Sequence, residues 1–400
     1  MLNSGLDWIL GGRSTASLFN AASALVPLYL PTTGTDFSPL GALHSLGDAL
    51  RLKGQYLSCN ASIYREGRQT HPGRDVPTEI YERWLFDEYT RGGSIVIRRY
   101  EELNAAAQCL KNALAIELMS EISVHAYVSP ASAQAFSAHF DPHNALILQL
   151  DGEKSWEVAR NHYIKYPLQE DAQSQSVPSD ELTGCDVITM QRGDVLFIPA
   201  GRVHRVRTSS EVSFHITVGV RELSWEGLAV ALLKDARMRD ERFRQPAKGE
   251  PPAWLVQLAG DLNATVNTEL AVRRGFDRHR VDLVDSLTPP ARAYLSSEVS
   301  TAIGPQTMLA LVPGIYAATI TYGDRVRLNF SGISTPGRPS YVEGPIALES
   351  TFKYMAENLG TFLVSEIPGG LTEEARVAIA QRLISEGLLV PASVISNQKT

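Results

Sequence analysis

The stretch Gly193-Asp-Val-Leu-Phe-Ile-Pro-Ala-Gly-Arg-Val-His204 decides the fold that this sequence predicts. Gly193-Asp194 is typical of a turn, and Val195 to Ile198 is a short apolar run that predicts a buried strand. Pro199-Ala-Gly201 predicts a second tight turn. The two turns and the strand would deliver His204 to the interior of a β-barrel.

A second stretch, His139-Phe-Asp141, supplies side chains that can act together with His204. Side chains alternate between the two faces of a strand, so residues i and i+2 point the same way. His139 and Asp141 would therefore share a face, and His204 would complete a set of two histidines and one carboxylate. Such a set holds Fe(II) and leaves coordination positions open for chemistry. The spacing of Gly193, Pro199, Gly201 and His204, G-x5-P-x-G-x2-H, resembles the second motif of the cupin barrel.

The composition describes an ordinary globular chain. At about 100–200 residues per domain, 400 residues suggest two or three domains. A hydrophobic content of 44% and a charged content of 20% are typical of soluble proteins. The net charge is 37 − 44 = −7, which argues against nucleic acid as a partner of the whole surface. The local arginines are either solvated charged faces, the commoner case, or anion contacts: Arg202, Arg205 and Arg207, and Arg273, Arg274, Arg278 and Arg280.

The cysteines and the N-terminal region indicate a cytoplasmic protein without a membrane segment. Cys59, Cys109 and Cys185 are odd in number and far apart, which fits neither a disulfide framework nor a C-x-x-C zinc site. The uncharged run from Ser14 to Thr35 contains Pro27 and many polar residues, and no basic segment precedes it. We therefore expect neither a signal peptide nor a membrane span there.

The hydrophobic pattern predicts a mainly β domain followed by helices. Helices are expected over 78–89 and 101–117, and strands from about residue 94 to Val220. Asp151-Gly152, between the apolar runs 145–150 and 155–158, predicts a β-hairpin. Residues 161–184 are polar and are expected to form an irregular loop. Ser224 can cap a helix, and further helices are expected after Pro345 and over 371–386.

Three collinear segments between residues 92 and 220 carry a resemblance to a known family. His125-Ala-Tyr-Val-Ser-Pro-Ala-Ser-Ala-Gln134 resembles N-x-Y-x-T-P-x-G-S-Q, His139-Phe-Asp141 resembles H-Y-D, and Leu148-Gln-Leu-Asp-Gly-Glu-Lys-Ser-Trp156 resembles L-Q-L-E-G-x-K-x-W. These are segments of the JmjC-type, cupin-fold 2-oxoglutarate oxygenases, in the branch of the ribosomal protein hydroxylases. The resemblance implies a double-stranded β-helix (jelly-roll) barrel over 1–222, a helical dimerisation-like segment over 223–300 and a winged-helix-like domain over 301–400.

The resemblance also implies roles for single residues. His139, Asp141 and His204 would bind Fe(II), Lys154 would pair with the distal carboxylate of 2-oxoglutarate, and Tyr127 would assist. Apart from the resemblance, Lys154 follows the strand after the metal-binding pair, so its ammonium group either faces the same cavity and binds a dicarboxylate or lies exposed in a turn.

The sequence departs from the family pattern at three positions, where His125 replaces asparagine, Ala135 replaces glycine and Gly219 replaces serine. His125 is interpreted either as a cosubstrate-binding residue or as a buried core histidine. His143 is expected at the rim of the site. His215 is expected in the core or next to a metal ligand.

The predicted activity is that of a 2-oxoglutarate-dependent dioxygenase that hydroxylates an amino-acid side chain in a protein or peptide. One alternative is a biosynthetic hydroxylase of a peptide natural product or a free amino acid. Another is a cupin that binds a ligand without catalysis. The expected partners are a protein, peptide or amino-acid-derived substrate and a second copy of the chain as a homodimer, but no membrane.

Overall fold

The computed structural model describes residues 4–31, 34–43, 60–70, 72, 76–174, 177–246, 269–289, 303–331, 340–358 and 360–396. The chain divides into two compact units, Leu2–Glu222 and Leu223–Thr400, which we call the N-terminal and C-terminal units. The predicted division near residue 300 lies outside the described residues and stays a prediction, and Cys59 also lies outside them.

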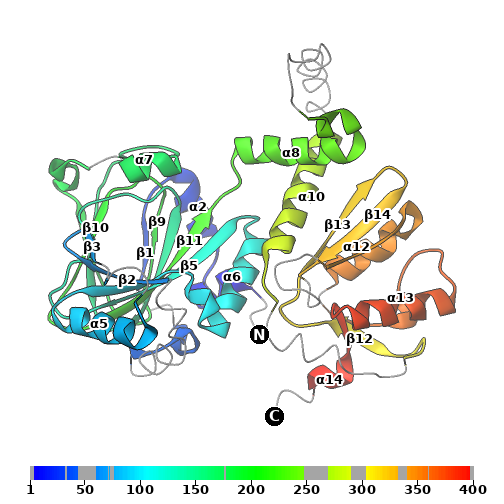
Figure 1. Ribbon diagram of the computed structural model, residues 1–400, viewed down its shortest axis with the longest axis horizontal. Coiled ribbons are helices and arrows are strands. Elements are labelled where there is room, and N and C mark those ends of the chain that lie inside the picture. Colours follow the sequence, from blue (N-terminus) through cyan, green and yellow to red (C-terminus); the bar gives the residue numbers. More distant parts are fainter. Residues whose placement is uncertain are drawn as a thin grey trace. The chain divides into compact units, whose positions relative to one another are not determined.

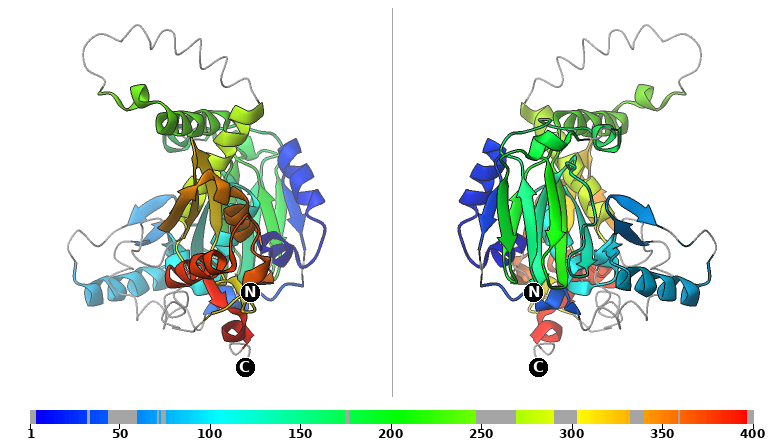
Figure 2. Two further views of the ribbon diagram at one scale, coloured as in Figure 1. Left: turned by 90° about the vertical axis from the view of Figure 1, so that its right-hand side faces the viewer. Right: turned by 90° about the vertical axis from the view of Figure 1, so that its left-hand side faces the viewer.

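Two antiparallel sheets form the N-terminal unit (Figures 1 and 2). The larger sheet has the strand order β1-β9-β6-β11-β5-β4-β2-β3, and the smaller has the order β10-β7-β8. Their bounds are β1 Leu28–Leu30, β2 Ala61–Arg65, β3 Arg68–Thr70, β4 Ser94–Ile97, β5 Glu121–Ser129, β6 Asn144–Asp151, β7 Lys154–Val158, β8 Asp186–Met190, β9 Val195–Ile198, β10 His204–Thr208 and β11 Ser213–Arg221. The prediction of a cupin-like β fold that ends near Val220 is confirmed.

The two sheets pack face to face through one apolar cluster. Ile147 on β6 and Leu196 on β9 come from the larger sheet, and Trp156 on β7 and Met190 on β8 come from the smaller. All four side chains are buried because the inward positions alternate along each strand. This packing leaves a cavity between the sheets at the positions where the inward residues are polar.

The predicted hairpin at Asp151-Gly152 is wrong. β6 pairs with β9 and β11, whereas β7 pairs with β8 and β10, so the turn takes the chain from one sheet to the other. Gly152 has φ +62°, and a Cβ there would lie 1.8 Å from the carbonyl oxygen of Val212. The glycine therefore marks a tight crossing beside β11 rather than a hairpin loop.

Helices flank the sheets of the N-terminal unit. They are α1 Gly5–Leu10, α2 Ala16–Ala24, α5 Thr78–Thr90, α6 Ala105–Glu117 and α7 Gln169–Ser174. The helices predicted over 78–89 and 101–117 correspond to α5 and α6, and the side chain of Asn104 caps α6. The prediction for 161–184 missed α7, which is a short helix with little apolar periodicity.

The C-terminal unit combines helices with two small antiparallel sheets. The helices are α8 Trp225–Arg239, α10 Glu269–Ser286, α12 Glu349–Glu357, α13 Glu373–Ser385 and α14 Ala392–Ser396. The strands are β12 Met308–Leu311, β13 Ala317–Tyr322, β14 Arg325–Phe330, β15 Ser340–Pro345, β16 Thr361–Leu363 and β17 Leu389–Pro391, in the orders β13-β14-β15 and β16-β12-β17. As predicted, the Ser224 side chain caps α8, accepting a hydrogen bond from Gly227 N–H.

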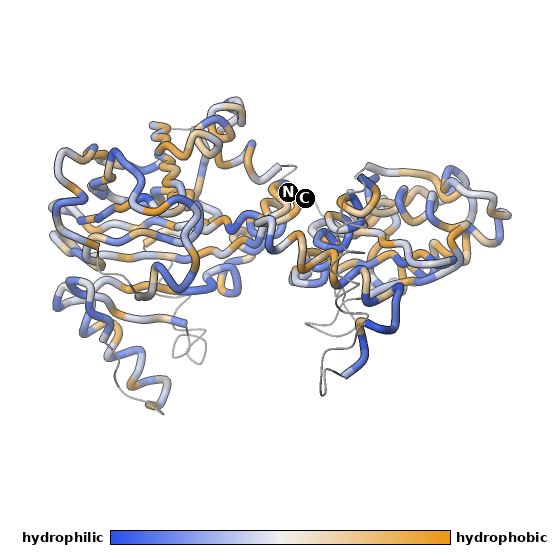
Figure 3. The backbone as a smooth tube through the Cα atoms, turned by 90° about the horizontal axis from the view of Figure 1, so that it is seen from above, coloured by the Kyte–Doolittle hydropathy of each residue, from blue (hydrophilic) through white to orange (hydrophobic). Residues whose placement is uncertain are grey.

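Hydrophobic and hydrophilic segments alternate along the chain in both units (Figure 3). In the C-terminal unit, Phe330, Phe352 and Phe362 are fully buried in one cluster. Among the described residues, no helix is both long and apolar enough to cross a membrane.

Candidate metal centre and cosubstrate pocket

Backbone hydrogen bonds bring the two predicted motifs together. The N–H of His204 donates to the carbonyl of His139 (2.8 Å), and the N–H of His139 donates to the carbonyl of His204 (3.1 Å). The Gly201 N–H donates to the Asp141 carbonyl (2.9 Å). Gly201 has φ +74°, and a Cβ there would lie 1.8 Å from the carbonyl oxygen of Ile164, so only glycine fits this turn.

The side chains of His139, Asp141 and His204 converge on one point. One ligand atom from each lies within 4.8 Å of the other two, and Asp141 Oδ2 lies 3.7 Å from His204 Nε2. The Nδ1–H of His139 donates to the Ser137 carbonyl (2.9 Å), and the Nδ1–H of His204 donates to the carbonyl of Arg202 (3.0 Å). These bonds fix the tautomer in which each Nε2 keeps a lone pair for a metal ion.

Burial and neighbouring charges hold His204 and Asp141 in protonation states that can bind a metal ion. Burial, together with the neighbouring His139, lowers the pKa of His204 to about 4, so the imidazole is neutral near pH 7. Burial raises the pKa of Asp141, but the imidazoles of His204, His139, His143 and His125 outweigh this effect, so its pKa is lower than usual. A neutral imidazole and an ionised carboxylate are the protonation states that bind a divalent metal ion.

Lys154 lies at the other end of the same small sheet. Its side chain is 2% exposed, and its Nζ donates to Ser129 Oγ (3.0 Å) and lies 3.2 Å from His215 Nδ1. Burial lowers its pKa to about 7, and no described carboxylate forms an ion pair with it. A buried amine with no counter-charge is costly unless an anion binds beside it.

The triad and Lys154 line one cavity of about 210 Å³. Tyr127 also lines it and stacks on His215 with ring centroids 4.7 Å apart. The cavity has polar groups at both ends and an apolar middle, and its lining residues are Tyr127, Ala135, Phe136, His139, Asp141, Ala145, Ile147, Lys154, Trp156, His204, Val206, His215 and Thr217. A small dicarboxylate fits such a lining because one end meets an amine and the other meets a metal site.

His125, predicted as a cosubstrate-binding residue, and His143, predicted at the rim of the site, are not among the residues that line the cavity. His125 lies on β5 two positions before Tyr127 and so faces the same side, but it is not among the residues that line the cavity. Its Nδ1 accepts a hydrogen bond from the backbone N–H of Arg99 (3.2 Å). His143 lies against Gly219 of β11.

Sequence reasoning missed Ser129, although a signal for it exists. Ser129 follows Tyr127 by two positions on β5, so both side chains face the cavity side of the strand, and Ser129 accepts the hydrogen bond of Lys154. The sequence predicted a role for Tyr127 but none for Ser129.

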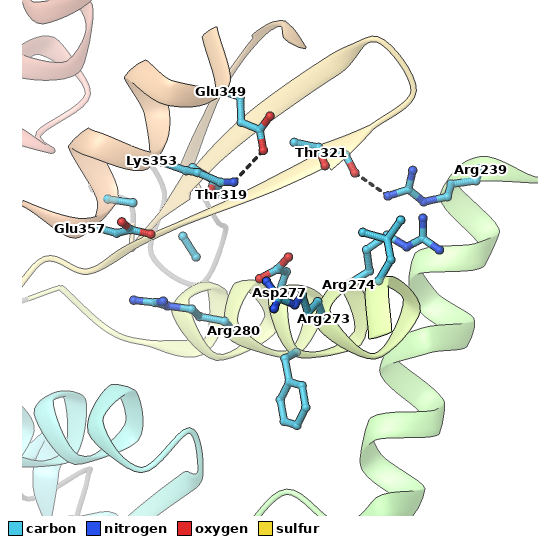
Figure 4. A pocket seen from close by; sticks show the side chains of 14 residues that line it. Arg239, Arg273, Arg274, Asp277, Arg280, Thr319, Thr321, Glu349, Lys353 and Glu357 are labelled. Carbon is cyan, nitrogen blue, oxygen red and sulfur yellow. Dashed lines mark hydrogen bonds and ion pairs between the residues drawn. The ribbon is translucent and has the colours of Figure 1, made fainter. Parts of the chain in front are cut away.

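A larger cavity of about 680 Å³ lies in the C-terminal unit (Figure 4). Several of its cations are paired with acids of the same unit: Arg273 pairs with Glu269 (2.6 Å) and Lys353 with Glu349 (2.7 Å). Arg239 donates to the carbonyl of Thr321 (2.6 Å). Basic and acidic side chains are mixed in this lining, and we place no site there.

Comparisons with known proteins agree with the fold. The sequence model of the JmjC domain matches residues 102–228. Ribosomal oxygenase 1 of Danio rerio is 24% identical over 86% of this chain and 70% of that protein. The uncharacterized protein YxbC of Bacillus subtilis is 30% identical over 28% of this chain, and NO66 of Brugia malayi, described as a bifunctional lysine-specific demethylase and histidyl-hydroxylase, is 32% identical over 35%.

The matched part spans 38% of YxbC and 20% of the Brugia malayi protein, less than half of either. Among solved structures, Escherichia coli YcfD matches with a TM-score of 0.53 and 14% identity, over 91% of this chain and 94% of YcfD. At this identity the match shows the fold alone.

Proposed function

We propose that this chain, whose residues 102–228 form a JmjC domain, is an Fe(II)- and 2-oxoglutarate-dependent oxygenase that hydroxylates an amino-acid side chain of a protein or peptide. The observation that carries the proposal is that buried Lys154, which forms no ion pair with any described carboxylate, lines the same cavity as His139, Asp141 and His204.

The donor set fits Fe(II). Two imidazoles with free Nε2 lone pairs and one carboxylate are the ligands of oxygenases that keep coordination positions open for cosubstrate and oxygen. His139, Asp141 and His204 would hold the metal ion. The carbonyls of Ser137 and Arg202 would keep the two rings in the required orientation.

Lys154 and Tyr127 would bind and orient 2-oxoglutarate. An ammonium group that shares a buried cavity with a carboxylate gains a charge-assisted hydrogen bond, and Ser129 would hold the amine in place. His125 is proposed as a further residue that binds 2-oxoglutarate, with its Nε2–H as the hydrogen-bond donor. When bound, Fe(II) with 2-oxoglutarate and O2 supplies the oxidant that converts a C–H bond to C–OH, with succinate and CO2 as coproducts.

The substrate class rests on the named relatives. Ribosomal oxygenase 1 and NO66 are named for action on ribosomes and on lysine or histidine side chains, which favours a protein substrate for this chain. The solved complex of YcfD with cobalt and succinic acid, a ribosomal oxygenase by its description, supports the metal and the coproduct.

Mass spectrometry of ribosomal proteins from cells with and without the gene tests the proposal. We expect one added oxygen atom on a ribosomal protein in the first cells and its absence in the second. A modified small metabolite instead would favour a biosynthetic hydroxylase. If the purified protein forms no succinate with either substrate class, the proposal is wrong.

We further propose a cytoplasmic homodimer with a winged-helix-like domain over 301–400. Large apolar side chains lie exposed on α8 and α10, namely Trp225 (84%), Leu270 (63%) and Phe276 (42%). Exposed apolar side chains favour a protein contact, and a second copy of this chain would cover them.

A further inference from the structure

Gly219 occupies a position where the backbone does not require glycine. It lies inside β11, paired with Ser123 on β5 and Ala145 on β6, and it is not among the glycines with positive φ. A glycine inside a strand often marks a close approach by another group. Here two groups approach, because a Cβ on Gly219 would lie 2.7 Å from Ser123 Oγ and 3.0 Å from His143 Nε2.

The ring of His143 therefore lies on the cavity side of the larger sheet. Thr217 and His215 line the cavity, and position 219 faces the same side because alternate residues of a strand share a face. His215 contacts Lys154 at one end of β11, and Gly219 lies four residues further along the strand. The small sheet runs correspondingly from Lys154, opposite Thr208, to Val158, opposite His204.

His143 therefore lies on the cavity face of the larger sheet, beside Gly219, although it is not among the residues that line the cavity. Its imidazole is close enough to Asp141 and His204 to affect the pKa of both, and His125 affects the pKa of Asp141 in the same way.

Both additional imidazoles have a hydrogen-bonding atom to offer. The Nδ1 atom of His143 is buried and has no hydrogen-bond partner among the described residues. The Nδ1 atom of His125 accepts the N–H of Arg99, so its neutral ring carries the proton on Nε2. Buried polar atoms without a partner are rare in folded proteins and call for one.

We propose that His143, given room by Gly219, is a specificity-determining residue that hydrogen-bonds a polar group of the substrate beside the metal. This inference rests on the proposed function and adds a residue to it. The side chain that is hydroxylated would then carry a nitrogen or oxygen atom near the target carbon.

The test compares His143→Phe with His143→Asn in the full-length, iron-loaded protein. The probe is the pool of ribosomal proteins from cells that lack the gene, and the readout is the amount of hydroxylated product per succinate. Phe keeps a ring but no polar atom, so we expect this ratio to fall at least about tenfold, whereas Asn should keep it within about threefold of wild type. The absorption band of the anaerobic Fe(II)–2-oxoglutarate complex should stay unchanged in both variants.

Two further variants separate specificity from packing. Gly219→Ser should displace the His143 ring and lower the same ratio. His162→Phe is the matched control, because His162 contacts the carbonyl of Leu25 outside the cavity and should not change the ratio. An unchanged ratio in His143→Phe would overturn the inference. Loss of the Fe(II)–2-oxoglutarate absorption band in both His143→Phe and His143→Asn would also overturn it. So would hydroxylation of an aliphatic side chain by the wild-type protein.

A failure of the proposed function has a different signature, because the wild-type protein would then show neither the band nor succinate. In that case ¹⁵N-histidine NMR of the full chain, titrated with propionamide as a polar side-chain mimic, decides the inference. A saturable shift of the His143 nitrogens that is absent in Gly219→Ser supports it. No shift refutes it.

Discussion

Replacing Lys154 with methionine should stabilise the free protein at pH 7 and weaken cosubstrate binding. Methionine keeps the length and apolar stem of the side chain but removes the buried amine. The two effects have opposite signs because the amine is costly in the free protein and useful only when an anion binds. A substitution that stabilises a fold while it removes activity is typical of a binding residue.

The magnitude follows from the pKa of Lys154, which is 10.5 in its ordinary state and about 7 in the folded protein. The folded pKa is lowered, so the unfolded chain binds more protons between about pH 7 and 10.5, and the stability of the wild-type protein rises with pH in that window. At pH 7 the buried amine costs about 4 kcal/mol, and at pH 10 about 1 kcal/mol. The substitution also removes hydrogen bonds to Ser129 and His215 that are worth about 1 kcal/mol each.

We therefore expect the Lys154→Met variant to be about 2 kcal/mol more stable than wild type at pH 7 and about 1 kcal/mol less stable at pH 10. Urea unfolding at the two pH values, without cosubstrate, measures this change of sign. The affinity for 2-oxoglutarate should fall at least about 30-fold, as expected when one partner of a buried charge pair is removed. A variant that is less stable at pH 7 and binds 2-oxoglutarate normally would refute the reasoning.

Four other substitutions test the fold, the pocket and the assembly. Gly201→Ala should cost at least about 2 kcal/mol in urea unfolding because its Cβ meets the Ile164 carbonyl, whereas Gly193→Ala, also at positive φ but in open space, should cost about 1 kcal/mol; equal costs would contradict the turn geometry. Tyr127→Phe keeps the stack on His215 and should weaken 2-oxoglutarate binding about 3- to 10-fold, as measured by calorimetry. An unchanged affinity would show that the Tyr127 hydroxyl does not bind 2-oxoglutarate. Phe276→Asp should convert the proposed homodimer to a monomer in light scattering, and a monomeric wild-type protein would refute the dimer.

The sequence predicted the convergence of His139, Asp141 and His204 better than the path of the chain. The pair His139 and Asp141 shares a face by strand periodicity alone, and the glycines around His204 fix the turn that brings it back. The prediction of a hairpin at Asp151-Gly152 was wrong because these residues indicate a tight turn but do not determine which strands pair on either side of it. Whether β7 pairs with β6 or with β10 depends on contacts distant in sequence.

The surroundings of the triad were less predictable for a related reason. His143 was expected at the rim because it follows Asp141 by two residues. Its position also depends on Gly219 on another strand, which has no side chain and so leaves room for the His143 ring. The burial of Lys154 could be inferred only as one of two possibilities, because a lysine after a turn is more often exposed.

An anaerobic titration of the protein with Fe(II) and 2-oxoglutarate tests the central claim most directly. The wild-type protein should develop the charge-transfer absorption band of an iron-bound 2-oxo acid, saturating at one Fe(II) per chain, and His204→Ala should develop none. A wild-type protein without the band, or a His204→Ala variant that binds iron and 2-oxoglutarate as well as wild type, would contradict the account.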